Sequence, residues 1–461
     1  MLARFAIVTT LFFFAALIPC ESSLGQAFGF GNGLNNRAVG GVKIDAKGVL
    51  SEGKALLDPE IRERIAKGLE KSDAQIKSAT ELRMISLRGL EAAIAKALES
   101  GGTVSNEARY MAGLQRIEYV IVEPETNDII LAGPGEGFKV NDQGVVVGSK
   151  SGTPVVQLED FLCAIRSADA ARTGQGISVS IDPTQQGIQR LQQFFTSLKR
   201  NHQGFDPSMQ PKVEKAMGQQ TISLTGVPTD SRFSQVLVAA DYKMKRLAMG
   251  LDSAPIDNFP SFMEMAKKAK ASRLSAAPRF WMECSYQPVA KSEDGNVWQI
   301  RGTGVKTLTE EEKFDANGNK SAKRAKPNRF AAQWAQAMTE RFEELSAAEP
   351  AFRELRNVMD ISVIAAILKS EGLIEKVGLE IPSILGSQNH KIPTYSVPKT
   401  IPAQCSYVRI SGSWLVSASG GIQLDSWAVA KNTQAIAEVG EVAKLAAKVG
   451  DNWWWNSKAK N

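Results

Sequence analysis

A strand, a capping segment and a helix follow one another twice in the middle of the chain, and this repeated order limits the fold more than any other feature. The first unit predicts a strand at 177–181 and a helix at 184–200, joined by a cap at 182–184. The second unit predicts a strand at 221–224 and a helix that ends at Gly250. That helix carries apolar residues at helical spacing: Phe233, Val236, Leu237, Ala240, Met244 and Leu247.

Pairs of short β-branched runs surround these two units. Asn, Asp, Gly and Pro residues between such runs predict β-hairpins. We interpret four stretches in this way: 42–50, 117–132, 138–147 and 280–301. In the last of these, 280–289 is expected to pair with 297–301. Because hairpins accompany strand–helix units, the sequence predicts an α+β fold with mixed sheets and more than one domain, rather than a doubly wound parallel sheet.

Helices account for much of the remaining sequence. Apolar residues at helical spacing predict them at 59–71, 78–99, 155–166, 330–345 and 352–373. Gly89 lies inside the second of these and weakens its helical pattern. Toward the C-terminus we expect short strands near 407–410 and 414–417, and a last strand and helix within 427–449.

Changes of pattern divide the chain into consecutive segments. The stretch 310–329 is charged and poor in apolar residues, which predicts a linker or exposed loop. Around it we expect a signal peptide and four folded segments: 1–27 as the signal, 28–104 with a strand pair and helices, 105–203 and 204–309 as α+β domains, and 330–461 with helices and a short sheet.

The N-terminus has the organisation of a cleavable secretory signal. Arg4 gives a positive start, residues 5–18 form an apolar run, and small residues lead to a cleavage position after Ala27. The apolar run of about 14 residues is shorter than the roughly 20 that a spanning helix needs. We therefore expect an exported, periplasmic or extracellular chain without a transmembrane segment in its mature form. Acylation of Cys20 is the alternative, which Pro19 disfavours.

The net charge of the chain is mildly positive. Lys and Arg number 55 against 49 Asp and Glu, a formal net charge of +6. Because these charges are spread along the sequence, they do not form the concentrated basic patch of a nucleic-acid-binding protein. We expect no nucleic-acid partner, and a protein or glycan of the cell envelope is the expected partner class.

Cysteine and histidine are too scattered to form a zinc site. Cleavage leaves Cys163, Cys284 and Cys405, and the only histidines are His202 and His390. No pair of them has the close spacing of zinc ligands, and the sequence predicts neither a metal nor another cofactor. Three thiols in an oxidising compartment permit one disulfide and a free cysteine, or all three are buried apolar side chains.

Three segments begin like ligand-binding loops without completing their motifs. Residues 315–321 start like a calcium loop, but lysines replace its glycine and its bidentate glutamate. Residues 302–307 have Val305 where a phosphate loop has the glycine before its lysine. We expect a solvated turn at 315–321, no nucleotide at 302–307, and a turn rather than an anion nest at 133–137.

Catalytic residues are unknown from the sequence. It has no Gly-x-Ser-x-Gly elbow, and both histidines lie in polar stretches. A glycosidase needs two carboxyl groups about 5 to 10 Å apart, a distance that sequence spacing does not fix. We expect solvated turn charges for the carboxylates around one predicted hairpin, and note a further acid on a predicted strand: Glu123, Glu125, Asp128 and Glu136, with Glu283 on the strand.

Charged residues follow one another on the helix after 221–224. Asp241 and Lys245 lie four residues apart, the spacing of a surface ion pair. With Lys243 and Arg246 they form either a solvated face, which we expect, or a basic face that binds anions.

Trp453, Trp454 and Trp455 are the most unusual local feature. Three consecutive indoles cannot all face one core, so at least one should remain exposed, stack on a ligand, or dock against a partner or membrane interface. They form the candidate binding surface that the sequence offers. Folding of the three residues back onto the last helix is the alternative.

Five blocks carry a family resemblance, at 41–50, 119–137, 236–251, 278–286 and 355–366. On these blocks the chain resembles an uncharacterised family of secreted planctomycete proteins, classed as a domain of unknown function. The resemblance spans most of the mature chain. It implies no activity, fold or catalytic residue.

These observations favour a non-catalytic exported protein of the cell envelope that works through binding or assembly. The alternative is a secreted or periplasmic hydrolase, carboxylate-based and glycan-directed, whose acids the fold would bring together. Paired acids with raised pKa values would favour the enzyme, and exposed aromatic residues in a shallow groove would favour binding.

Overall fold

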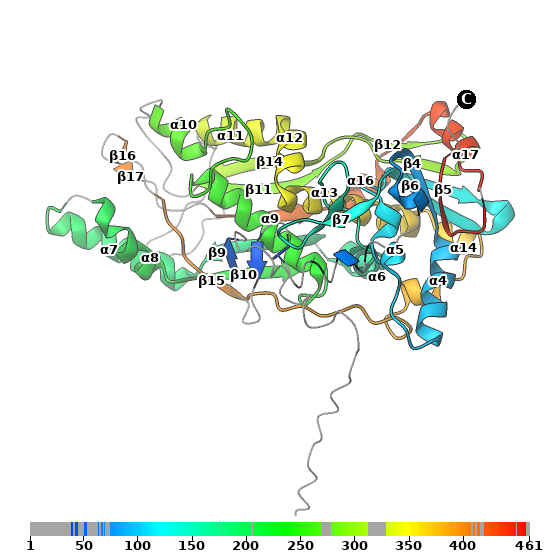
Figure 1. Cartoon of the computed structure of the whole chain (residues 1–461). Coiled ribbons are helices and arrows are strands. Elements are labelled where there is room, and N and C mark those ends of the chain that lie inside the picture. The colour runs from blue at the N-terminus through cyan, green and yellow to red at the C-terminus, as the bar shows by residue number, and fades with distance from the viewer. Residues whose placement is uncertain are drawn as a thin grey trace, which may run out of the picture.

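The computed structural model contains two large β-sheets joined by a long hairpin and packed around one long helix (Figure 1). Both sheets combine parallel and antiparallel pairs, and the predicted α+β class with mixed sheets is confirmed. The signal segment and the calcium-like loop lie outside the described residues. These are 74–174, 176–203, 206–268, 278–311, 329–406, 409–410, 413–414, 419–448 and 450–457, with short elements before 74.

The seven-stranded sheet has the order β19-β12-β13-β5-β6-β4-β20. At its centre lies the predicted hairpin of β5 (Tyr119–Glu123) and β6 (Asp128–Gly135), whose turn places Asn127 in the left-handed conformation. The other strands come from distant parts of the chain: β4 (Thr80–Ser86), β12 (Val289–Lys291), β13 (Val297–Gln299), β19 (Thr433–Ala435) and β20 (Trp454–Asn456).

The six-stranded sheet has the order β14-β11-β18-β9-β10-β15. Its strands β9 (Ile177–Pro183) and β10 (Gln219–Thr225) are those of the two predicted strand–helix units, and they pair antiparallel. The helix of the second unit, α9 (Arg232–Ala248), contacts this sheet through its predicted apolar face. The remaining strands are β11 (Pro278–Ser285), β14 (Gly304–Glu311), β15 (Thr400–Pro402) and β18 (Ser419–Leu424).

One long hairpin passes from the six-stranded sheet into the seven-stranded sheet. β11 pairs with β14 and β12 pairs with β13, in one continuous register. The hairpin predicted at 280–289 and 297–301 is confirmed, and its second limb runs on to Glu311. Gly302 and Gly304 have φ values of 116° and 84°, which only glycine adopts readily, and the second limb bends there between the sheets.

The helix α13 (Pro350–Ser370) lies in the middle of the molecule and is buried on all sides. It contacts α6 (Leu158–Thr173), α9 and α16 (Ser426–Lys431), as expected for a helix that is apolar around its whole circumference. Other described helices are α3 (Ala74–Lys77), α4 (Leu87–Glu99), α5 (Asn106–Arg109), α10 (Phe262–Lys268), α11 (Arg329–Glu340), α12 (Phe342–Ala348), α14 (Leu373–Lys376), α15 (Pro382–Leu385) and α17 (Glu441–Leu445).

Part of the predicted helix 78–99 is wrong. Residues 80–86 form β4, and α4 begins at Leu87, where the hydroxyl of Ser86 accepts a hydrogen bond from the Gly89 amide. Side chains alternate between the two faces of β4, so a period of two fits this stretch and a period of 3.6 does not.

Two other predicted elements need adjustment, and a third cannot be compared over most of its length. The predicted helix 155–166 is shifted, since α6 begins at Leu158 and continues to Thr173. The predicted helix 330–345 is divided into α11 and α12 at Arg341. The helix predicted at 59–71 falls mostly on residues that the structure does not describe.

The predicted segments do not correspond to separate sheets. The boundary between 203 and 204 lies between β9 and β10, which are hydrogen-bonded to each other. The segment 330–461 supplies β18, which lies between β11 and β9. One hydrophobic cluster extends from Ile76 to Trp454 and includes residues of both sheets. Sequence periodicity indicates where a strand lies but not which distant strand pairs with it. For this reason the segment boundaries predicted from the sequence separate strands that are paired in the structure.

Within the described ranges, no helix combines the length and the apolar character needed to cross a bilayer.

Candidate functional site

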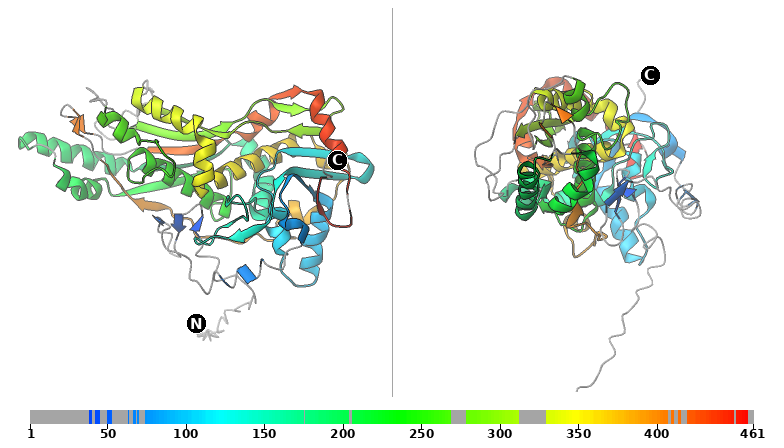
Figure 2. Two further views of the ribbon diagram at one scale, coloured as in Figure 1. Left: turned by 45° about the horizontal axis from the view of Figure 1, so that its top comes forward. Right: turned by 90° about the vertical axis from the view of Figure 1, so that its left-hand side faces the viewer.

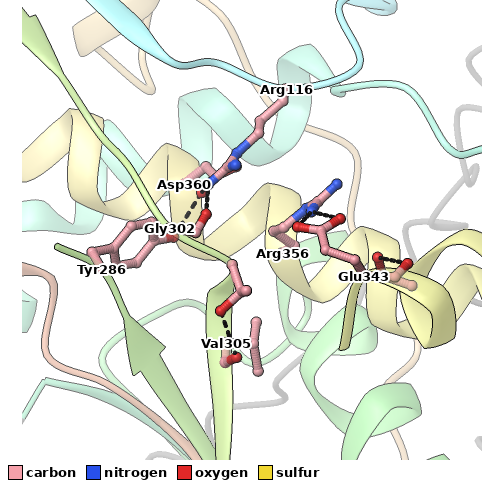
Figure 3. Close-up of polar contacts among 9 residues, drawn as sticks. Arg116, Tyr286, Gly302, Val305, Glu343, Arg356 and Asp360 are labelled. Carbon is pink, nitrogen blue, oxygen red and sulfur yellow. Dashed lines mark hydrogen bonds and ion pairs between the residues drawn. The ribbon is translucent and has the colours of Figure 1, made fainter. Parts of the chain in front are cut away.

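A buried cluster of polar side chains, which we call the polar hub, lies where the long hairpin passes α13 (Figure 3). It consists of Arg116, Tyr286 and Asp360. Asp360 is 1% exposed, and its carboxylate accepts hydrogen bonds from Arg116 Nε at 2.7 Å, from Arg116 Nη2 at 3.1 Å and from the Tyr286 hydroxyl at 2.7 Å. Arg116 Nη2 also donates to the carbonyl of Gly302 at 3.0 Å. The hub therefore connects α13, the hairpin bend and the segment before β5.

The charges of the hub stabilise one another. Burial disfavours the charged form of Arg116, but the charge and the hydrogen bonds of Asp360 outweigh this and raise the pKa of the guanidinium. Burial and the neighbouring Asp360 raise the pKa of Tyr286 well above its ordinary value. Arg116 therefore stays charged and Tyr286 stays a hydrogen-bond donor at neutral pH.

Arg356 lies one turn before the hub on α13 and is 3% exposed. Its Nη1 donates to both carboxylate oxygens of Glu343, at 2.6 and 2.7 Å. Its stem lies beneath the hairpin bend, because a Cβ on Gly304 would stand 2.9 Å from Arg356 Cγ. Residues 302–307 thus form a bend followed by a strand, and Gly304 is required by close packing rather than by a phosphate.

Glu118 is half-buried beside the hub. Burial raises the pKa of its carboxyl group; Asp360 and Glu343 add to this effect, and Arg116 and Arg356 oppose it. In the part of the chain that the structure describes, no donor is hydrogen-bonded to its side chain, in contrast to Asp360. Glu118 is therefore the candidate general acid of this region, whereas Asp360 is fully engaged in holding the fold together.

A second buried cluster surrounds Arg232 at the start of α9. Its guanidinium contacts Asp160 and Glu354, and Glu159 lies 3.8 Å from Nε. Tyr395 donates to Glu159 at 2.6 Å. Three carboxylates thus share one guanidinium. Burial raises the pKa of Asp160 to about 7; Arg232 opposes the rise, and the two other acids add to it.

The charged residues of α9 do not form the solvated face that we expected, nor an anion-binding surface. Asp241 is 0% exposed, and Lys245 Nζ donates to it at 3.0 Å and to the carbonyl of Ile181 at 2.6 Å. Lys243 lies 3.1 Å from Asp252 and from Glu349. The expectation was wrong because α9 is covered by the six-stranded sheet and by α13, so these ion pairs are internal.

Two of the four hairpin carboxylates are internal as well. Glu125 is exposed and Glu123 is half-buried, as expected for turn residues. Asp128 instead accepts from the backbone amide of residue 88 at the start of α4, and Glu136 accepts from the amides of residues 150 and 151. Both carboxylates are 5% exposed, because they satisfy backbone donors that would otherwise be buried without partners.

Most of the glycine-rich turn predicted at 133–137 and the strand acid Glu283 belong to the β-sheets. Residues 133–135 continue β6, and a Cβ on Gly133 would stand 2.2 Å from the carbonyl oxygen of Arg116, so close packing explains this glycine. Glu283 on β11 forms an ion pair with Lys306 on β14, 2.9 Å apart, and accepts a hydrogen bond from the indole of Trp281.

The three C-terminal tryptophans are divided between two cores. β20 pairs antiparallel with β4 at the edge of the seven-stranded sheet. Trp454 and Trp455 are 2% and 3% exposed and belong to different hydrophobic clusters, because successive side chains of a strand point to opposite faces. The cluster of Trp455 includes residues of α17. Trp453 is partly exposed, so the candidate binding surface of three indoles is reduced to this one.

Cys163, Cys284 and Cys405 are free thiols, so these three residues form no disulfide with one another. Burial raises the pKa of Cys163, Cys284 and Cys405 to about 12. His202 is exposed, and burial lowers the pKa of His390. Among the residues that the structure describes, no group of three or more His, Cys, Asp or Glu side chains has the arrangement to hold a metal ion.

Sequence reasoning did not identify Arg116, Tyr286, Asp360 or Arg232 as members of polar clusters. One signal for Asp360 was present in the sequence. It is a charged residue next to the apolar run 361–368, and a carboxylate in a helix that is otherwise apolar needs a partner in the interior. No comparable local signal marks the other three.

Comparison with known protein families gives one match. Residues 179–262 match the model of a family described as a protein of unknown function (DUF1598). The matched segment runs from within β9 to the start of α10 and includes α9. The match confirms one part of the expected resemblance, namely that the chain contains a domain of unknown function. Comparisons with curated proteins and with solved structures gave no match.

Proposed function

We propose that the mature chain is a non-catalytic, exported protein that binds or assembles in the cell envelope. The observation that carries this proposal is that the buried polar groups are already occupied by hydrogen bonds and ion pairs within the chain. The Asp360 carboxylate accepts three hydrogen bonds, Arg232 contacts carboxylates of two other helices, and Lys245 donates to both a carboxylate and a carbonyl. Groups occupied in this way support the scaffold, whereas a catalytic group must have atoms free for the substrate.

The export part of the proposal has its own support. It rests on the signal grammar of residues 1–27 and on the resemblance to secreted planctomycete proteins. An N-terminus that starts at Phe28 on the protein recovered from the periplasm or medium would establish both export and the cleavage position. Recovery of the chain in the cytoplasm with residues 1–27 intact would contradict it.

The binding part is tested with the purified mature chain and an envelope fraction from the native host. We expect saturable retention of the protein on this fraction, with a fixed ratio of bound protein to envelope mass. A binding curve that stays linear, or retention no greater than that of an unrelated protein of similar charge, would contradict the proposal.

A carboxylate hydrolase remains the second candidate, and one observation favours it. Glu118 has a raised pKa and lies in the electrostatic environment of Glu343, so an acid and a carboxylate occur in the same region. Hydrolysis by this pair predicts that Glu118→Gln abolishes the release of soluble fragments from envelope glycan. The matched control is Glu107→Gln on α5, which lies outside the hub and should leave any such activity unchanged.

A further inference from the structure

Two helices form an arm between the neighbouring strands β9 and β10. α7 (Gln185–Arg200) leaves the end of β9, and α8 (Gln210–Met217) returns to the start of β10. Figures 1 and 2 show this arm projecting from one end of the molecule. Its apolar side chains pack into a small cluster together with Ala403 and Cys405, which follow β15, and leave the outer faces polar. The cluster contains Val213, Met217, Ala403 and Cys405, with Leu191, Phe194 and Phe195 packed against it.

The arm is the more basic end of the molecule. Between residues 185 and 217 there are five basic and two acidic residues, a formal net charge of +3, which is half of the +6 of the whole chain. Lys199, Arg200, Lys212 and Lys215 are all exposed. In the described structure none of these four has an ion-pair partner, whereas Arg190 donates to carbonyls at the end of α8. Four cations of the arm are therefore available to a partner.

Two neighbouring turns at the opposite end of the molecule carry acidic residues. The turn between β5 and β6 carries Glu123 and Glu125, and Figures 1 and 2 place it at the far end from the arm. The turn between β12 and β13 lies beside it, because the amide of Val122 donates to the carbonyl of Asn296 at 2.8 Å. That turn adds the exposed acids Glu293 and Asp294, and neither turn contains a basic residue.

We propose that copies of this chain associate head to tail, with the basic arm of one copy against the acidic turns of the next. This inference rests on the assembly part of the proposed function. A contact between two different surfaces is heterologous, so it leaves a free arm at one end and free turns at the other. Association then continues into an open row of molecules.

A second copy is the partner that the molecule itself supports best. Its acidic turns lie at the end opposite its basic arm, so in a row of molecules the turns of one copy face the arm of the next. The apolar residues of the arm are packed within that cluster, so the contact between two copies is polar and electrostatic. Exposed ion pairs contribute about 0 to 1 kcal/mol each and weaken as salt screens them. The association is therefore weak and strongly dependent on ionic strength.

The first test is sedimentation velocity of the mature chain at low and high ionic strength. We expect concentration-dependent association at about 0.05 M salt and a monomer at about 0.5 M, where screening acts within a few ångströms. Lys199→Glu with Arg200→Glu should weaken association about tenfold or more. The matched control is Lys139→Glu with Lys150→Glu, which makes the same charge change at exposed positions around β7 (Phe138–Val140), away from both ends, and should associate like the wild type.

The second test uses complementary variants. One variant carries Lys199→Glu and Arg200→Glu in the arm, and the other carries Glu125→Lys and Glu293→Lys in the turns. Each should associate far more weakly alone than the wild type, because two of the four charged groups on its altered surface change sign and that surface loses its net charge. Mixed together they should pair, because the unaltered turns of the first variant meet the unaltered arm of the second. Circular dichroism of each variant confirms that it is folded before mixing.

Three outcomes would overturn the proposal: a wild type that is monomeric at low salt, a control variant that loses association to the same degree, or complementary variants that fail to associate when mixed. A monomeric wild type whose envelope retention is abolished by the arm variant would instead assign the arm to an anionic envelope component. In that case self-association fails and the proposed binding function stands.

Discussion

Gly89 of α4 lies directly against Trp453. A Cβ on residue 89 would stand 2.5 Å from Trp453 Cβ and 3.0 Å from its Cα. The carbonyl of Trp453 accepts a hydrogen bond of 2.8 Å from the amide of Ser86, the residue that caps α4. In the sequence Gly89 weakens a helix. In the structure its missing side chain allows the C-terminal segment to close over the start of that helix and β20 to join the sheet.

Gly89→Ala should lower the free energy of unfolding by about 1 to 2 kcal/mol, because overpacking outweighs the better helix propensity of alanine. Urea unfolding measures this loss. In a Trp453→Gly background the clashing Cβ is absent, and the same substitution should cost little or nothing. An equal cost in both backgrounds would show that the contact with Trp453 is not its cause.

Asp360→Ala should destabilise the protein by about 3 to 5 kcal/mol, because it leaves Arg116 buried without its counter-charge. Tyr286→Phe removes one hydrogen bond to the same carboxylate and should cost about 1 kcal/mol. Combining Asp360→Ala with Arg116→Leu should cost less than the two single changes added together. Strict additivity in urea unfolding would contradict a direct interaction between the two charges.

The stability of the protein should decrease as the pH rises from about 4 to about 7. The pKa of Asp160 is raised from its ordinary value of 3.8 to about 7, so the folded chain holds a proton there that the unfolded chain has already lost. Protonation therefore favours the folded state across this window. Asp241, with a pKa of about 6, acts in the same direction.

Unfolding free energies measured at several pH values test this dependence. Asp160→Asn should flatten the dependence of the unfolding free energy on pH between pH 4 and 7. The slope should decrease by at most the contribution of one bound proton. Asp206→Asn is the control: Asp206 is exposed and its pKa is lowered, so it acts only below this window. An unchanged slope in Asp160→Asn would disprove the assignment.

Cys163, Cys284 and Cys405 should resist alkylation while the protein is folded. Burial raises the pKa of each thiol to about 12, so little thiolate is present at pH 8. Iodoacetamide should modify none of them within minutes under native conditions and all three in denaturant. Modification of only one cysteine in non-reducing denaturant would reveal a disulfide and contradict three free thiols.

Strands, turns and helix faces of this chain were predictable where periodicity or turn residues within a short stretch define them. The strands at 177–181 and 221–224, the hairpin around Asn127 and the apolar face of α9 follow from periodicity and turn chemistry, and all are present. The largest departure is at 78–99, where Ser86 separates a strand from a helix that share one apolar pattern.

Long-range pairing was not predictable from the same signals. β4 joins β20 from the other end of the chain, and β11 lies parallel to β18 although more than a hundred residues separate them. The polar hub depends on such contacts, since Arg116 and Asp360 meet only after α13 is in place. Residue spacing contains no information on these distances, and an isolated arginine resembles any surface arginine.

A protein that binds or assembles in the envelope, as proposed, should not turn over an envelope substrate. A time course with the mature chain and native envelope material distinguishes binding from turnover, with bound protein and released soluble glycan measured in the same samples. We predict that bound protein reaches a plateau while released glycan stays at the level of a protein-free control. Glycan release that continues beyond one fragment per protein, and that Glu118→Gln abolishes, would contradict the claim and establish the hydrolase.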